Sequence, residues 1–193
     1  MALSYTKTMV ELKEILLRNR PQELYDISPK GTVPVLYFHN GSVIDESLDI
    51  IFWALKNSDP DGWLLDSKDS QLDLVVQNDN DFKTWLDKYK YFDRYPEFDQ
   101  EFYKEKCFKF LDILEQRLNK SYYLYRDTIS MSDVAIFPFV RQFAHVENNL
   151  KSSHSSLFAW LEKIKLSDLF LSVMEKYDEY SYDQNPIVTN FSR

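Results

Sequence analysis

The sequence predicts an α/β part followed by an all-α part, with a polar linker between them. Residues 28–53 follow the order turn, strand, hairpin turn, strand and capped helix, which is typical of an α/β unit. Beyond residue 70 the apolar residues recur at helical spacing, and no strand pattern is found. We therefore predict an α/β domain over residues 1–56, a turn-rich linker over residues 57–70 and an all-helical domain over residues 71–193.

The chain begins with short and irregular elements. Residues 1–8 read as the end of a helix rather than as the start of a domain. Residues 10–17 alternate apolar and charged side chains and then become apolar, which predicts a strand. Residues 21–25 can form a short helix, because Pro21 is well placed in a first helical turn.

A β-hairpin follows. Residues 29–31, Pro-Lys-Gly, have the composition of a turn. Residues 33–38 are β-branched and aromatic and predict a strand, with Pro34 near its start, where a missing N–H is tolerated. Asn40 and Gly41 predict a type I′ turn, because both central residues of that turn need positive φ.

The returning strand leads directly into a helix. Val43 and Ile44 start the strand, and either Asp45 or Ser47 is suited to cap the helix. The helix is indicated by apolar residues at helical spacing: Leu48, Ile51, Phe52 and Leu55.

The remaining chain reads as a helical bundle with a polar tail. Ser130 and Asp133 stand at the spacing of a capping box, in which each residue bonds the other's backbone N–H. We expect the tail from Asp178 to lie over the surface. Helices are predicted over residues 71–95, 99–119, 132–147, 155–165 and 167–177.

Composition excludes several classes of function. A net charge of −8 argues against nucleic-acid binding, which needs a basic surface. Only one cysteine, three histidines and three glycines are present, so we expect no metal site, no disulfide framework and no glycine-rich phosphate loop. No apolar run has the length of a membrane span, and the first twenty residues carry several charges, so neither membrane association nor secretion is expected. These features predict a cytoplasmic protein.

Two short stretches resemble the second half of the thioredoxin-like domain of glutathione S-transferases. They are residues 32–36, Thr-Val-Pro-Val-Leu, and residues 44–47, Ile-Asp-Glu-Ser. The resemblance implies that Pro34 is cis and that the backbone of Val33 pairs with the cysteinyl part of glutathione like an added strand. It also implies that Glu46 and Ser47 hold the γ-glutamyl end, because a helix N-terminus with a hydroxyl suits a carboxylate and an acidic side chain suits an ammonium.

A second resemblance extends over the helical part. Residues 130–138, Ser-Met-Ser-Asp-Val-Ala-Ile-Phe-Pro, are similar to the capped helix of the family's C-terminal domain. The two resemblances imply a partial thioredoxin-like domain followed by an all-helical glutathione S-transferase C-terminal domain. They also imply glutathione as co-substrate, a small electrophilic or disulfide substrate, and a homodimer.

Further site residues come from the same resemblance. Residues 18–21, Arg-Asn-Arg-Pro, resemble a stretch of omega-like members in which the second basic residue meets the glycine end of glutathione, so Arg20 is a candidate, with a solvated surface charge as the alternative. Lys30 is basic and nearby, with weaker support. The family's electrophile pocket is walled by the helix that here carries Trp85, Tyr89 and Phe92, although aromatic residues at helical spacing are more often core.

The family's catalytic cysteine is expected to be missing from this chain. In the omega-like and cysteine-using bacterial branches a Cys-Pro-aromatic motif starts the first helix, yet no such motif precedes residues 10–17. Compared with the family, a strand and the start of a helix are missing. From mean element lengths these amount to about 20 residues. Three explanations remain open: a start codon assigned late, a strand that is displaced, disordered or supplied by a partner, or a truncated relative. Cys107, on an apolar helical stripe, is expected to be a buried small hydrophobe rather than a nucleophile.

Two functions therefore stand side by side. The first is an enzyme that binds glutathione for conjugation or thiol transfer, whose nucleophile these residues do not supply. The second is a non-catalytic binding or regulatory module with the same fold.

Overall fold

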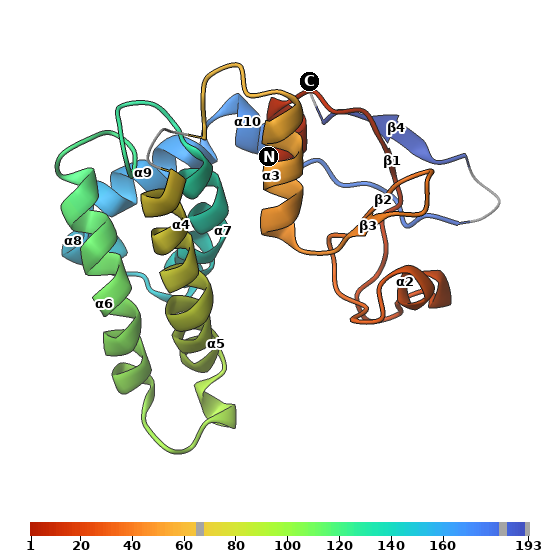
Figure 1. Cartoon of the computed structure of the whole chain (residues 1–193). Helices are drawn as coiled ribbons and strands as arrows, with labels where there is room; N and C mark the ends of the chain where they lie inside the picture. The colour runs from red at the N-terminus through yellow and green to blue at the C-terminus, as the bar shows by residue number, and fades with distance from the viewer. Residues whose placement is uncertain (65–67, 182–184, 192–193) are drawn as a thin grey trace. The chain divides into compact units, whose positions relative to one another are not determined.

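A computed structural model describes residues 1–64, 68–181 and 185–191. The chain divides into two compact units. The first unit joins Met1–Asp61 to Asp168–Arg193, so the two ends of the chain belong to one unit, as Figure 1 shows by colour. The second unit, Gly62–Ser167, is helical.

Three short elements open the first unit. They are helix α1 (Ala2–Tyr5), strand β1 (Val10–Leu12) and helix α2 (Gln22–Ile27), which begins directly after Pro21 as proline at a helix start allows. Strand β1 is shorter than the predicted strand over residues 10–17. Its length is set by its partner, because a ladder extends only as far as both strands do.

The partner of β1 comes from the other end of the chain. Strand β4 (Ile187–Thr189) pairs antiparallel with β1, with Val10 opposite Thr189 and Leu12 opposite Ile187 (Figure 1). The prediction that no strand follows the linker is therefore wrong. Three consecutive β-branched residues favour a strand, but a run this short is a weak signal without its partner.

Strands β2 (Leu36–Tyr37) and β3 (Val43–Ile44) form the predicted hairpin, with Leu36 opposite Ile44. The type I′ turn, however, is wrong. Gly41 has φ of 85°, whereas Asn40 is not in the positive-φ region. The N–H of Phe38 donates to the carbonyl of Ser42 over 2.9 Å and so closes a three-residue loop. A three-residue loop needs only one left-handed residue, so Gly41 alone suffices.

Helix α3 (Ser47–Asn57) follows β3 at once. Its N-cap residue is Glu46, whose side chain makes no cap bond, so the prediction that Asp45 or Ser47 is the cap is wrong. Asp45 is engaged elsewhere, because its carboxylate accepts hydrogen bonds from Ser28 and Lys30. The buried residues of α3 are Ile50, Ala54 and Leu55.

The C-terminal segment is attached to the first unit at several points. Helix α10 (Asp168–Ser172) is shorter than the predicted helix over residues 167–177. The hydroxyls of Ser172 and Ser4 share a buried 3.0 Å hydrogen bond. The N–H of Tyr180 donates to the carbonyl of Glu14 over 2.9 Å. The tail that was expected to lie over the surface is therefore bonded to the N-terminal elements and ends in a strand.

The second unit is a bundle of helices. The predicted helix over residues 71–95 is divided by a π-helical turn and ends in a 3₁₀ turn, while α6, α7 and α9 follow their predicted ranges to within one residue. The elements are α4 (Lys68–Gln77), η1 (Asn78–Phe82), α5 (Lys83–Lys90), η2 (Phe92–Arg94), α6 (Gln100–Leu118), α7 (Met131–Val146), α8 (Leu150–Ser153) and α9 (Ser155–Lys165).

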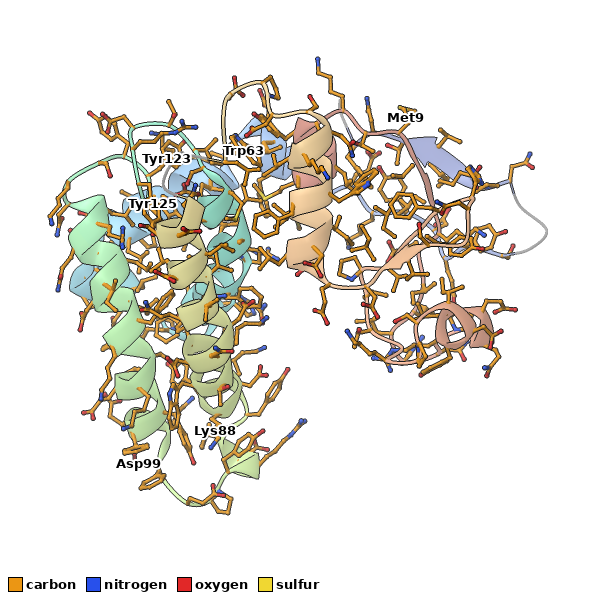
Figure 2. The ribbon with its side chains drawn as sticks, viewed as in Figure 1. Met9, Trp63, Lys88, Asp99, Tyr123 and Tyr125 are labelled. Atoms are coloured by element: carbon orange, nitrogen blue, oxygen red, sulfur yellow. The ribbon has the colours of Figure 1, made fainter. Side chains whose placement is uncertain are left out.

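Helix α6 is the longest helix of the described residues. It starts at its cap Asp99, whose carboxylate accepts the N–H of Phe102 over 2.8 Å. Figure 2 shows Asp99 and Lys88 at one end of the α5–α6 pair, and Tyr123 and Tyr125 beyond the other end of α6. Cys107, Leu111 and Leu114 of α6 are fully buried, which follows from their helical spacing on one face.

The predicted capping box of α7 is confirmed. The N–H of Ser130 donates to Asp133 Oδ2 over 2.9 Å. The other oxygen of Asp133 accepts the N–H of Leu124 and the indole N–H of Trp160, over 2.9 and 2.8 Å. Burial raises the pKa of Asp133, against hydrogen bonds led by that of Ser130 that lower it. A single carboxylate thus connects the loop before α7 with α9.

In the part of the chain that the structure describes, no helix combines the length and the apolar character that a bilayer span requires. The same residues hold no group of three metal-ligating side chains.

Candidate functional site

The predicted site residues Val33, Pro34, Glu46 and Ser47 gather at the open end of the β2–β3 hairpin. The paired register of the hairpin ends with Leu36 opposite Ile44, so Val33 and Pro34 lie just before its open end and Glu46 and Ser47 just after it. The Val33–Pro34 peptide bond is cis, as the family resemblance implies. Two stretches that are separated in the sequence therefore reach one corner because of the hairpin.

The backbone at this corner is open to pairing. Val33 lies outside β2 and is 45% exposed. No described residue forms a hydrogen bond with its backbone N–H or carbonyl. An exposed backbone without hydrogen bonds can accept a peptide strand through main-chain hydrogen bonds. Pro34 beside it is also exposed and has no N–H to offer.

The N-terminus of α3 supplies further donors. The first hydrogen bond of the helix runs from the N–H of Ile50 to the carbonyl of Glu46 over 3.0 Å, so the N–H groups before it have no helical partner. Ser47 is exposed, and its hydroxyl has no partner among the described residues. Donors at a helix N-terminus favour an anionic group.

Lys30 forms ion pairs with the two carboxylates of the corner, Asp45 and Glu46. Its ammonium lies 2.5 Å from Glu46 Oε1 and 3.3 Å from Asp45 Oδ1. Asp45 also accepts the hydroxyl hydrogen of Ser28 over 2.9 Å. This hydrogen bond, followed by those of Lys30, lowers the pKa of Asp45, and the hydrogen bond to Glu46 raises the pKa of Lys30. Sequence reasoning gave Lys30 only weak support, because the spacing of residues does not show which carboxylate a flexible side chain reaches.

A tight turn places Lys30 at the corner. The N–H of Gly31 donates to the carbonyl of Ser28 over 2.9 Å, and Gly31 has φ of 61°. A Cβ at Gly31 would lie 2.3 Å from the ring of Tyr25, so no other residue fits there without movement. Glycine is required here both by its left-handed backbone and by the ring of α2.

The other predicted site residues lie in separate places. Arg20 is exposed, in the segment before α2, and no ion pair with a described residue involves it. Tyr89 is buried in the helical unit, and its hydroxyl donates to Glu147 Oε2 over 3.1 Å. Trp85 is half-buried and stacks with Tyr103, whereas Phe92 is 43% exposed on η2.

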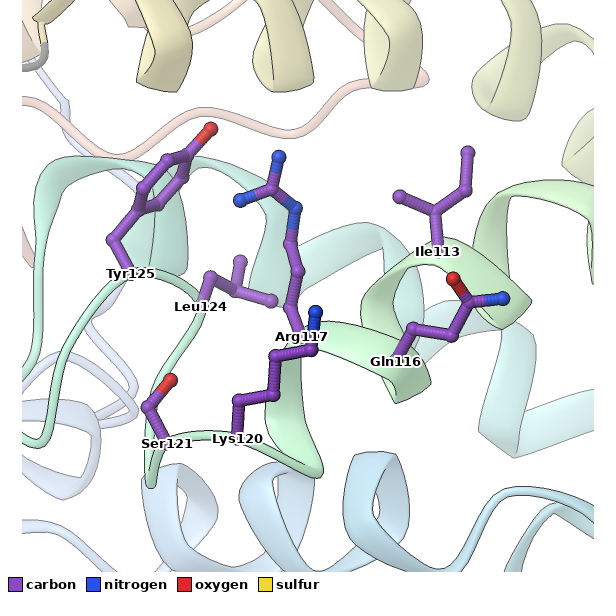
Figure 3. Close-up of a pocket in the computed structure, with 7 residues that line it drawn as sticks. All are labelled: Ile113, Gln116, Arg117, Lys120, Ser121, Leu124 and Tyr125. Atoms are coloured by element: carbon purple, nitrogen blue, oxygen red, sulfur yellow. The ribbon is translucent and has the colours of Figure 1, made fainter.

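A hollow lies elsewhere, at the C-terminal end of α6. It has a volume of about 470 Å³, and the guanidinium of Arg117 lies 4.5 Å from the centre of the Tyr125 ring. Figure 3 shows these two side chains next to each other. Sequence reasoning missed this hollow because a loop without a motif forms half of its wall. Its lining residues are Ile113, Gln116, Arg117, Lys120, Ser121, Leu124 and Tyr125.

The single cysteine, Cys107, belongs neither to the hairpin corner nor to the hollow beside Arg117. Cys107 is fully buried, and desolvation raises the pKa of its thiol to about 12. The prediction that it is a buried small hydrophobe is confirmed. A thiol acts as a nucleophile in its deprotonated form, which this environment disfavours.

Together, a small mixed α/β unit with this hairpin corner and a capped helical unit define a glutathione S-transferase fold. The family model of the glutathione S-transferase N-terminal domain matches residues 1–62, and that of the C-terminal domain matches residues 80–168. The chain belongs to the glutathione S-transferase family.

Solved structures agree with this fold. BphK, a bacterial glutathione S-transferase in a ternary complex, is similar with a TM-score of 0.73 at 17% identity, over 90% of this chain and 90% of that chain. Glutathione S-transferase 1-6 of Anopheles dirus species B gives 0.71 at 20% identity, over 85% and 81%. Glutathione transferase URE2P6 of Phanerochaete chrysosporium, in complex with oxidized glutathione, gives 0.68 at 18% identity, over 79% and 76%. A comparison with curated proteins finds no match.

Proposed function

We propose that this chain binds glutathione at the open end of the β2–β3 hairpin. The observation that carries the proposal is the exposed backbone of Val33, unbonded within the described residues, at the end of the hairpin where β3 leads into α3. The cysteinyl part of glutathione would pair with Val33 as a short added strand. The relative URE2P6 was solved with oxidized glutathione, which supports a ligand of this class for the fold.

The two ends of the tripeptide would be recognised by charge. The γ-glutamyl carboxylate suits the Ser47 hydroxyl and the free N–H groups of α3, and its ammonium suits Glu46. The glycine carboxylate suits the guanidinium of Arg20, which can bond a carboxylate with two parallel hydrogen bonds. This use of Arg20 is the reason to assign the chain to the omega-like, cysteine-using type.

The co-substrate role requires a second pocket for a small electrophile or disulfide. We assign it to the aromatic residues of α5 and η2, where Phe92 presents an exposed ring and Trp85 a half-exposed one. Tyr89, which is buried and bonded to Glu147, would support this wall from behind. A cytoplasmic homodimer completes the proposal, in line with the family resemblance.

Glutathione binding is tested by titrating isotope-labelled protein with glutathione and following amide shifts. In a double variant, Glu46→Gln with Ser47→Ala, we expect binding to weaken about tenfold, because an exposed ion pair and a hydrogen bond to a charged group are lost. The matched control, Glu175→Gln with Ser181→Ala, changes the same residue types at exposed positions and should bind normally. Millimolar glutathione that leaves the amides of Val33 and Ser47 unshifted would refute the proposal.

A second candidate function, a non-catalytic binding module, is favoured by one observation. The only thiol of the 193 residues is that of Cys107, which is buried and has a raised pKa. We therefore expect the 193 residues to bind glutathione without conjugating it to a chloronitrobenzene or transferring it to a mixed disulfide. Clear turnover of either substrate would refute the non-catalytic module. It would also require that a group other than a cysteine activates the glutathione thiol.

A further inference from the structure

We propose that Lys30 determines how strongly this site selects the amino group of its ligand. In the free protein the Lys30 ammonium holds the Glu46 carboxylate, which is the group that the ligand's ammonium requires. The inference rests on the proposed function, since it concerns the same site. Lys30 therefore acts as a specificity-determining residue and not as a catalytic one.

The geometry places one cation between two anions. Lys30 Nζ is 2.5 Å from Glu46 Oε1 and 3.3 Å from Asp45 Oδ1, so both carboxylates share a single ammonium. The three side chains together carry one net negative charge, which still attracts a cation. An incoming ammonium at Glu46 therefore competes with Lys30, whose shorter contact already uses Oε1.

The surrounding turn keeps Lys30 near the corner after it leaves Glu46. Gly31 is confined by its positive φ and by the ring of Tyr25, which fixes the backbone next to Lys30. Asp45 is held in place by the hydroxyl of Ser28 and remains as a second acceptor for the displaced ammonium. The exchange therefore moves Lys30 from two carboxylates to one rather than into open solvent.

The expected effect is moderate, because the ion pair is exposed. The side chains of Lys30 and Glu46 are 52% and 60% exposed, so water and salt screen their attraction. A ligand with an ammonium competes with Lys30 for Glu46, whereas a ligand without one leaves the pair intact. Removal of Lys30 should therefore help the first ligand selectively.

The experiment compares two ligands that differ only in the amino group, glutathione and glutaryl-cysteinylglycine. Dissociation constants are measured by calorimetry or amide shifts for the wild-type chain and for Lys30→Met. We expect the preference for glutathione to increase about two- to fivefold in the variant, the range given by exposed ion pairs. The gain should shrink at high salt, because the contact is screened.

Two further variants make the result specific. Lys176→Met removes an exposed lysine from the same unit and should leave the preference unchanged. Lys30→Arg keeps the cation and should behave like the wild type; it also shows whether the site tolerates substitution if Lys30→Met folds poorly. If both ligands bind and Lys30→Met shows the wild-type preference, the inference is wrong while the proposed function stands. If neither ligand binds any folded variant, the proposed function falls, and the inference with it.

Discussion

Val10 lies opposite Thr189 in an antiparallel ladder, so the first strand of the chain has the last strand as its neighbour. The C-terminal segment is also bonded through Ser172 to Ser4 and through Tyr180 to the carbonyl of Glu14. Residues 168–191 are therefore part of the structure of the N-terminal unit rather than an appendage of the helical one.

This pairing predicts that substitutions in β4 weaken the backbone hydrogen bonds of β1. Successive N–H groups of a strand point to opposite sides, so Ile187→Pro with Val188→Pro removes a donor that faces β1 whichever side it lies on. We expect a loss of about 2 kcal/mol in the free energy of unfolding and faster hydrogen exchange of the amides of residues 10–12. Ile187→Thr with Val188→Thr keeps two β-branched residues and should preserve both properties. Unchanged exchange in the proline variant would contradict the ladder.

Gly31 and Gly62 allow backbone strain and steric overlap to be separated. Their φ values are 61° and 62°, but a Cβ at Gly31 would overlap the Tyr25 ring, whereas none of the described atoms lies within 4 Å of one at Gly62. We expect Gly62→Ala to cost about 1–2 kcal/mol, the penalty of left-handed backbone for a residue with a Cβ. Gly31→Ala should lower the free energy of unfolding by more than Gly62→Ala does. Adding Tyr25→Ala to Gly31→Ala should restore part of the difference. Urea unfolding measures both effects. Equal losses at both glycines would show that the ring moves aside freely.

How far the sequence predicts the fold depends on how local each signal is. The capping box of Ser130 and Asp133 and the range of α9 were predicted closely, because caps and helical spacing are read within a few residues. The pairing of β1 with β4 was not, because it joins segments from opposite ends of the chain. Likewise, the N-cap of α3 was misassigned because Asp45 bonds Ser28, a contact made by tertiary structure.

The candidate site divides in the same way. Val33, Glu46 and Ser47 could be proposed because two short stretches resemble a known family, and the hairpin predicted between these stretches is present. The contact of Lys30 with Glu46 depends on the turn at Gly31, and the hollow beside Arg117 depends on the path of a loop. No local sequence pattern predicts either the Lys30–Glu46 contact or this hollow.

Arg20 provides a test of the glycine end of the proposed ligand. Arg20→Ala should weaken glutathione binding about tenfold, because a charge-assisted hydrogen bond to a carboxylate is lost. Binding of γ-glutamylcysteine, which lacks the glycine carboxylate, should not change. Arg18→Ala removes an equally exposed guanidinium two positions away and should bind both ligands normally. A similar loss in both arginine variants would indicate general charge attraction instead of a direct contact.

Cys107 gives a prediction with a defined dependence on pH. Burial raises the pKa of its thiol to about 12 from an ordinary value of 9.0, so its thiolate fraction near neutral pH is about a thousandfold lower than that of a free thiol. We expect a disulfide reagent to label the native protein only through unfolding. At reagent concentrations where labelling outpaces refolding, the rate should match the unfolding rate and should not follow the thiolate population between pH 7 and about pH 9.

The same shift makes stability depend on pH with a definite sign. Between pH 9 and 12 the unfolded chain has released this proton while the folded chain still holds it, so the free energy of unfolding falls as the pH rises. Cys107→Ala should remove this part of the alkaline loss, at the expense of about 1 kcal/mol at neutral pH for the smaller side chain. Urea unfolding of both proteins across this range measures the difference. Parallel curves for the two proteins, or fast labelling of the native thiol, would show that Cys107 is more accessible than its full burial in α6 implies.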